Sequence, residues 1–124
     1  MKIRMQSNSI RYRLKEPEVH EFKNAGIIIE SIQLGSNSDS FLRFILRKSD
    51  SEQISVQFEN NTTVIQIPKD IANEWTGTGS VGFDAAIDLE NGRTLKVLVE
   101  KDFECLEANK EENIGAYPNP MKNC

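Results

Sequence analysis

Five basic residues open the sequence, and they are the side chains whose types and spacing could do chemistry. They alternate with apolar residues, and no acidic residue precedes Glu16. Alternation places every second residue on the same face of a β-strand, and guanidinium forks bind phosphate or carboxylate groups through paired hydrogen bonds. The pattern therefore predicts an anion-binding face that consists of Lys2, Arg4, Arg11, Arg13 and Lys15.

Two other interpretations explain the same basic face without a ligand. Like charges opposite one another across strands destabilise a sheet, so acidic residues of the same chain could offset them. The segment from Glu100 to Glu112 is acidic and could lie on this face; its carboxylates are Glu100, Asp102, Glu104, Glu107, Glu111 and Glu112. Alternatively, water alone could solvate the long basic side chains.

The basic residues are positioned by a predicted β-hairpin with its turn at Ser7-Asn8-Ser9. Alternation of period two continues through most of the chain and indicates half-buried strands. A short helix is expected from Glu16-Pro17 to Gly26, since proline and acidic residues suit a first helical turn and glycine ends a helix. A second helix is expected from Pro68 to Gly77. We detect no internal repeat.

Matching apolar faces predict how the later strands pair. A loop at Ser49-Asp50-Ser51 would pair residues 41–48 with residues 52–59, and a turn at Asn60-Asn61 would pair 52–59 with the next strand. In the last hairpin, a three-residue loop at Glu90-Asn91-Gly92 keeps the apolar faces together, whereas a two-residue turn mixes them. The result is an α+β fold, mostly antiparallel β, with two short helices and about eight strands, arranged as a barrel or as two packed sheets.

The composition excludes several classes of protein. The chain has 124 residues, 38% of them hydrophobic and 27% charged, and a net charge of −4, which argues against nucleic-acid binding. No apolar run approaches the ~20 residues of a membrane helix, and the first residues lack the apolar stretch of a secretory signal. We expect a cytoplasmic protein with a single α+β domain at residues 1–106 and an acidic or polar tail at residues 107–124.

The remaining reactive side chains predict no catalytic residue, metal site or cofactor. His20 is the only histidine, and Cys105 and Cys124 are too distant in sequence to suggest a ligand pair. The glycine-rich segment Gly77-Thr78-Gly79-Ser80-Val81-Gly82 follows a helix and enters a strand, whereas a dinucleotide-binding motif runs from a strand into a helix. It is therefore expected to be a connection.

Four motifs, spread over nearly the whole chain, resemble those of a family of short uncharacterised bacterial proteins with no assigned function. They are Asn8-Ser9-Ile10-Arg11-Tyr12-Arg13-Leu14, Phe58-Glu59-Asn60-Asn61, Val99-Glu100-Lys101-Asp102-Phe103-Glu104-Cys105 and Pro118-Asn119-Pro120. The resemblance implies a bacterial protein of one domain and carries over no functional residue. The segment Arg11-Tyr12-Arg13 is also similar to the lining of tunnel-shaped triphosphate hydrolases, although Lys2-Ile3-Arg4 replaces their initial Glu-x-Glu-x-Lys signature.

These patterns favour a binding or interaction module without enzymatic activity. Its partner would be a small anionic ligand or another protein, and the chain would be a monomer or a homodimer formed through an exposed sheet edge. The first alternative is an enzyme that acts on a phosphorylated or otherwise anionic small molecule, with the basic face turned inward in a polar barrel. The second is a structural domain whose acidic tail covers its own basic face.

Overall fold

The computed structural model describes residues 1–103 and residue 117. Eight strands and two helices follow one another in the described part of the chain. Their order and bounds are β1 (Lys2–Gln6), β2 (Ser9–Leu14), α1 (Glu16–Ala25), β3 (Ile27–Gln33), β4 (Phe41–Ser49), β5 (Ser55–Glu59), β6 (Thr62–Pro68), α2 (Lys69–Gly77), β7 (Gly82–Asp88) and β8 (Thr94–Lys101). The expected boundary between domain and tail at residue 106 lies outside the described residues.

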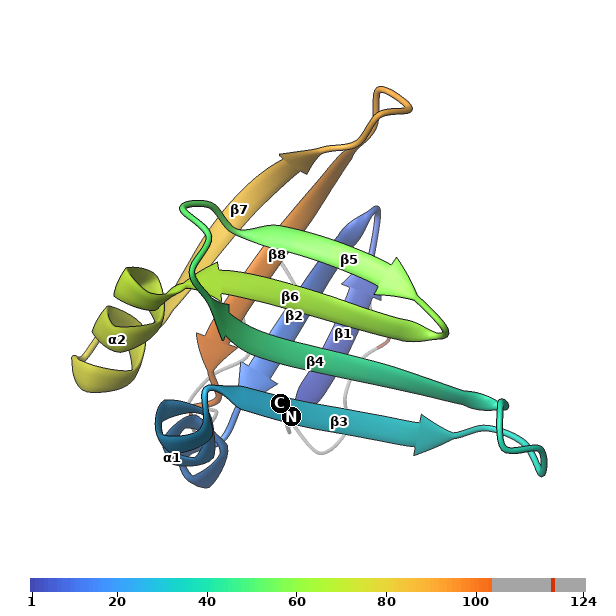
Figure 1. The fold of residues 1–124 in the computed structure, drawn as a ribbon, viewed down its shortest axis with the longest axis horizontal. Coiled ribbons are helices and arrows are strands. Elements are labelled where there is room, and N and C mark those ends of the chain that lie inside the picture. Colours follow the sequence, from blue (N-terminus) through green and yellow to red (C-terminus); the bar gives the residue numbers. More distant parts are fainter. Residues whose placement is uncertain (104–116, 118–124) are drawn as a thin grey trace.

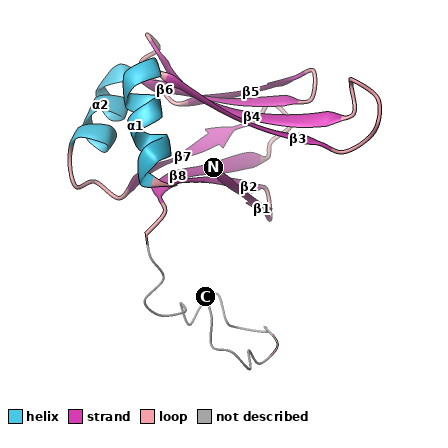
Figure 2. Cartoon of the chain, turned by 90° about the horizontal axis from the view of Figure 1, so that it is seen from below, coloured by secondary structure: helices cyan, strands magenta, loops and turns pink. Residues whose placement is uncertain are grey.

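The strands form two four-stranded sheets that pack against each other as two layers. Sheet A has the order β1-β2-β8-β7 and sheet B the order β3-β4-β6-β5. The strands of the two sheets cross in Figure 1, and both helices lie at the same end of the layers in Figure 2. In the described residues the two sheets do not join into a barrel, so the packed-sheet form of the predicted fold is confirmed.

Alternation and turn residues predicted three hairpins correctly. Ser7 and Asn8 form the turn between β1 and β2, and Asn60 and Asn61 form the turn between β5 and β6, all four with positive φ. Asparagine tolerates this backbone conformation better than most residues. In the last hairpin, Gly92 has a φ of 80°, and β7 pairs with β8 in the register that the three-residue loop requires.

The expected hairpin between residues 41–48 and 52–59 is wrong. The strand β4 instead pairs in parallel with β6, so that Leu46 lies beside Ile65, and β5 lies at the sheet edge. In the same way β2 pairs in parallel with β8. Alternation fixes which face of a strand is buried, but not which strand lies next to it.

The core lies between the sheets and under the helices. From α1, Phe22 packs against Trp75 of α2, with their ring centroids 6.1 Å apart. Tyr12 is fully buried between the layers, where its hydroxyl donates a hydrogen bond to the carbonyl oxygen of Thr63 across the two sheets, at 3.3 Å. Burial therefore raises the pKa of the Tyr12 hydroxyl far above its ordinary value, although a backbone hydrogen bond at Ile45 opposes the shift.

The fold contains an internal repeat that the sequence did not reveal. The unit β1-β2-α1-β3-β4 is followed by β5-β6-α2-β7-β8, with the same order of hairpin, helix and hairpin. Each unit contributes one hairpin to each sheet, and the second strands of the hairpins meet in parallel at both sheet centres. The registers also match, because Tyr12 lies beside Val99 in sheet A as Ile65 lies beside Leu46 in sheet B.

Equivalent positions of the two units share burial rather than residue type. The fully or almost fully buried pairs are Tyr12 with Ile65, Leu14 with Ile67 and Phe22 with Trp75. An identity search along the chain cannot find such pairs. Equivalent positions of the two units can therefore be compared. Where one unit has a charged residue and the other an apolar residue, the fold does not require the charge.

Candidate functional site

Four of the five predicted anion-binding residues lie on one face, the outer face of sheet A. On β1 and β2, the residues that alternate with buried Ile10, Tyr12 and Leu14 point away from the core. The register sets Lys2 opposite Arg13 and Arg4 opposite Arg11. Lys15 is different, because it follows the end of β2 and precedes the first turn of α1.

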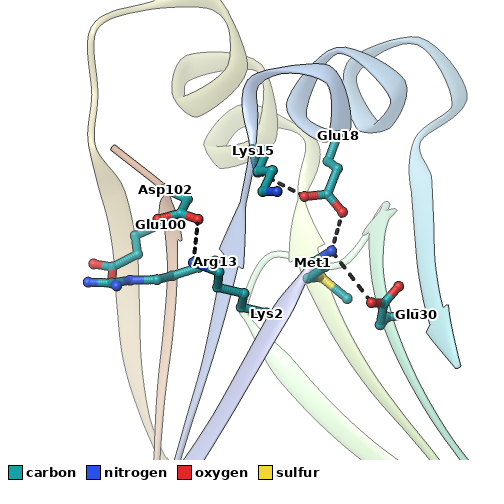
Figure 3. A network of polar contacts seen from close by, with 8 residues as sticks. All are labelled: Met1, Lys2, Arg13, Lys15, Glu18, Glu30, Glu100 and Asp102. Atoms are coloured by element: carbon teal, nitrogen blue, oxygen red, sulfur yellow. Dashed lines mark hydrogen bonds and ion pairs between the residues drawn. The ribbon is translucent and has the colours of Figure 1, made fainter. Parts of the chain in front are cut away.

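Carboxylates from the end of β8 contact three of these cations. The Arg13 Nε donates a hydrogen bond to Glu100 Oε1 at 2.6 Å, and the Arg11 Nε lies 3.5 Å from the same oxygen. The Lys2 Nζ lies 3.1 Å from Asp102 Oδ2. Figure 3 shows Glu100 beside Arg13 and Asp102 beside Lys2. Because β2 and β8 are parallel neighbours, these acids are brought to the basic face by the central pairing of sheet A.

For Lys2, Arg11 and Arg13, this arrangement supports the interpretation in which acidic residues of the same chain offset the positive charge of the basic face. It also fixes the two guanidinium groups in place, since Glu100 is only 17% exposed and contacts both of them. The face is therefore partly neutralised, with its arginine side chains ordered in advance.

A hollow of about 670 Å³ lies on the same outer face, beside Arg11. Arg11 of β2 and Lys96 of β8 supply its cations, and Asp84 of β7 supplies one carboxylate. The register places Leu98 between Arg11 and Asp84. Small side chains on this face leave the space open; they belong to Ser9 and Ala86.

Lys96 was not among the residues predicted to bind an anion, whereas Glu100 was expected in the acidic segment that could lie on the basic face. The pairing of β7 with β8 was predicted, and it already places Lys96 beside Ala86 and Leu98 beside Asp84. What could not be read from the sequence is the parallel pairing of β2 with β8, which joins the two hairpins into one face. Lys96 is thereby placed beside Ser9, two residues from Arg11.

A second polar network lies at the start of α1 and is centred on Glu18. Its carboxylate accepts a hydrogen bond from the Lys15 backbone N–H at 2.9 Å and contacts the amino group of Met1. That amino group also lies 3.7 Å from Glu30 of β3. Figure 3 shows how Glu18 joins the first strand of sheet A to the helix. The network orders Lys15 at the helix start rather than on the basic face.

The Glu18 carboxyl gives a prediction for the pH dependence of stability. Burial alone would raise its pKa, but the amino group of Met1, the Lys15 backbone and the Lys15 charge together lower it. A carboxyl whose pKa is lower in the folded state stabilises the fold above its unfolded pKa of about 4.3 and loses this contribution as the pH falls through the folded value. Glu18→Gln should thus reduce the free energy of unfolding by about 0.5–1.5 kcal/mol at pH 7 and by much less at pH 3.

Urea unfolding of Glu18→Gln and wild type at both pH values measures this difference. The control is Glu21→Gln, an exposed position on the same helix, which should change the free energy of unfolding little at either pH. An equal loss of stability at pH 7 and pH 3 would show that Glu18 acts through packing and not through its charge.

Of the other candidate side chains, only that of His20 lies in the described part of the chain. His20 is exposed on α1, where its Nε2 lies 3.8 Å from Glu16, and Cys105 and Cys124 fall outside the described residues. Among residues 1–103 and 117, no three histidine, cysteine, aspartate or glutamate side chains gather as metal ligands. The segment from Gly77 to Gly82 joins α2 to β7, as expected of a connection.

The tunnel-shaped enzyme required a closed barrel with the basic face inward. Residues 1–103 instead form two packed sheets with apolar residues between them, and the basic face points outward. The prediction of such a tunnel is therefore wrong.

None of the helices in the described residues has the length and apolar character needed to cross a membrane.

Comparison with known proteins places the chain in a family without adding a chemistry. No curated protein and no solved structure matches it. The family of unknown function DUF7009 matches residues 1–121, which include all the described strands and helices. This agrees with the resemblance to an uncharacterised family that the sequence motifs suggested. The chain belongs to the DUF7009 family.

Proposed function

We propose that the protein is a binding module for a small anionic ligand, a phosphate or carboxylate compound, which occupies the hollow on the outer face of sheet A. The observation that carries this proposal is that Arg11 and Lys96, from two neighbouring strands, both line one hollow of about 670 Å³. Both cations come from central strands of the sheet, so their backbones are held from both sides. With its hydroxyl, Ser9 adds a neutral hydrogen-bonding group.

The internal repeat supports a role for these charges beyond folding. The position equivalent to Arg11 in sheet B is Val64, and the position equivalent to Asp84 is Ile29, as the matching registers show. The same backbone arrangement thus forms with apolar residues at both positions. A fold that accepts valine does not require arginine there, and charged groups in a hollow are candidates for binding.

Two carboxylates set the strength and selectivity of the proposed site. Glu100 holds the guanidinium groups of Arg11 and Arg13, which reduces the entropy lost when a ligand binds. Asp84 lines the hollow opposite the cations and would repel a highly charged anion. The ligand class that fits is therefore a compact anion with one or two charges, such as the phosphorylated or carboxylated small molecules of the cytoplasm, the location that we propose.

Thermal unfolding of the full chain with sodium phosphate and with tripolyphosphate, at constant ionic strength in sodium chloride, tests the proposal. A ligand at 100 times its Kd stabilises the folded state by about 2.7 kcal/mol, and we expect a rise in Tm of several degrees with phosphate and a smaller rise with the more highly charged tripolyphosphate. The variant with Arg11→Gln and Lys96→Gln should lose the rise, and Asp84→Asn should enlarge it. Arg47→Gln, at an exposed cation of sheet B, is the control that should retain it.

Carboxylates of the acidic segment beyond residue 103 could occupy the proposed site in place of a free anion. A full-length variant that lacks four of these carboxylates distinguishes the two cases. In this variant four glutamates become glutamine: Glu104, Glu107, Glu111 and Glu112. A phosphate-dependent rise in Tm that is seen only in this variant would still support the site and would assign its natural occupant to the chain itself. No rise in either protein, or a rise that Arg11→Gln with Lys96→Gln leaves unchanged, would overturn the proposal.

A further inference from the structure

The outer face of sheet B carries a row of apolar side chains across three strands. The registers place Ile29 of β3 beside Ile45 of β4, and Ile45 beside Val64 of β6. The side chain of Ile29 is 51% exposed. Four residues before Ile45 on the same strand, the ring of Phe41 also lies on this face, with its centroid 4.8 Å from the Arg43 guanidinium.

The equivalent face of sheet A shows that folding does not demand this row. Where sheet B has Ile29, Val64 and Phe41, the repeat places Asp84, Arg11 and Thr94 in sheet A. Of the row itself only Ile45 has an apolar equivalent, Leu98. Apolar side chains that gather on one outer sheet face, where the same fold accepts charged ones, mark an interaction surface.

We infer that this face binds a second copy of the same chain. With a two-fold axis parallel to the strands, between β4 and β6, each β4 lies over the β6 of the other copy. Ile45 then packs against Val64 of the copy at the centre of the interface, and Ile29 lies opposite the aliphatic part of Gln57 of the copy. Aligned sheet packing of this kind brings two faces to about 10 Å from each other.

Charge complementarity selects this axis. One row of the face consists of Ser31, Arg43, Thr62 and Glu59, in that order across the strands. The Arg43 Nε lies 3.4 Å from Ser31 Oγ, so the guanidinium reaches toward β3. The two-fold axis sets Glu59 of the copy opposite Ser31, beside that guanidinium, and the same pair forms twice. An axis perpendicular to the strands would instead bring Arg43 against Arg47 of the copy, which is repulsive.

The size of the face predicts a weak dimer. Four strands at ~4.8 Å spacing and about seven residues at ~3.3 Å each cover roughly 450 Å² per copy, or about 900 Å² in total. Stable interfaces bury about 1,200–2,000 Å², so a face of this size fits a weak dimer that forms only at high protein concentration. The anion-binding hollow lies on sheet A and stays open in such a dimer.

Sedimentation velocity of the full chain from about 2 to 500 µM tests the inference. Wild type should change from monomer to dimer over this range. Val64→Arg and Ile29→Asp should remain monomeric, and both should fold because Arg11 and Asp84 occupy the equivalent positions. Circular dichroism checks their folding. Thr94→Arg, on the outer face of sheet A, is the control that should still dimerise.

A charge exchange tests the axis itself. Arg43→Glu and Glu59→Arg should each weaken dimerisation, and the double variant should restore at least part of it, since the pair would then form with reversed charges. A wild type that stays monomeric at 500 µM would overturn the inference and leave the face to another protein. Association that survives Val64→Arg would equally overturn it, and neither outcome affects the proposed anion site.

Discussion

Replacing Trp75 by alanine is expected to lower the free energy of unfolding by about 3–5 kcal/mol, the usual loss for a large aromatic side chain in a core. Trp75 is 1% exposed and contacts the rings of Phe22 and Phe83, with centroids 6.1 and 5.4 Å away. Its indole N–H donates a hydrogen bond to the carbonyl oxygen of Val81 at 3.1 Å. One side chain thus joins the two helices to the start of β7, at the end of the sheets that the helices cover.

Urea unfolding followed by circular dichroism measures the loss. Trp75→Phe should cost clearly less, because it retains an aromatic ring between Phe22 and Phe83 and loses the indole hydrogen bond. Ile71→Ala, on the same helix but at a half-buried position, is a second comparison with a smaller expected loss. If Trp75→Ala cost less than about 1 kcal/mol, the contacts of Trp75 with Phe22, Phe83 and Val81 would not stabilise the fold as described.

Replacing Gly82 by alanine should destabilise the protein by about 1–3 kcal/mol, the range for overpacking. A methyl group at this position would lie 2.5 Å from the Val99 carbonyl oxygen and 2.9 Å from the Glu100 Cβ. The first contact is with the backbone of a central strand, which cannot rotate away as a side chain can. Relief requires a shift of β7 relative to β8, next to the carboxylate that holds Arg11.

Gly79→Ala is the matched control, because nothing lies within 4 Å of the position that its methyl group would take. Thermal unfolding of both variants compares them directly, and only Gly82→Ala should show a lower Tm. The shift of β7 should also weaken any phosphate-dependent stabilisation, since Asp84 and Ala85 line the hollow. A Gly82→Ala protein as stable as Gly79→Ala would show that the close approach of β7 to Val99 is not retained in solution.

The faces of the strands and most of the hairpins could be predicted from the sequence because both depend on local chemistry. Alternation with a period of two separated Tyr12 and Arg11 onto opposite faces of one hairpin, and asparagine or glycine marked the turns with positive φ. Pairing between distant strands is not local. Several strands with apolar alternation could pair with β4 equally well. That β4 pairs with β6 and not with β5 depends on how the two sheets pack as a whole.

The candidate site divides in the same way. Four cations were found because they lie within one hairpin, whereas Lys96 and Asp84 reach the face only through the parallel pairing of β2 with β8. The repeat was missed for a different reason, since its equivalent residues keep their burial and change their identity, as Phe22 and Trp75 do. The same property makes the repeat informative, because differences between its halves separate function from folding.

We propose that the two equivalent sheet faces have different functions, and exchanging one pair of equivalent residues tests this division most directly. Arg11→Val and Val64→Arg each install the residue that the other half of the fold already carries. Phosphate-dependent Tm and sedimentation at 500 µM are measured on both variants. Arg11→Val should lose the response to phosphate and still dimerise, and Val64→Arg should respond to phosphate and remain monomeric. Two variants that each keep both properties, or that each lose both while folded, would contradict the account.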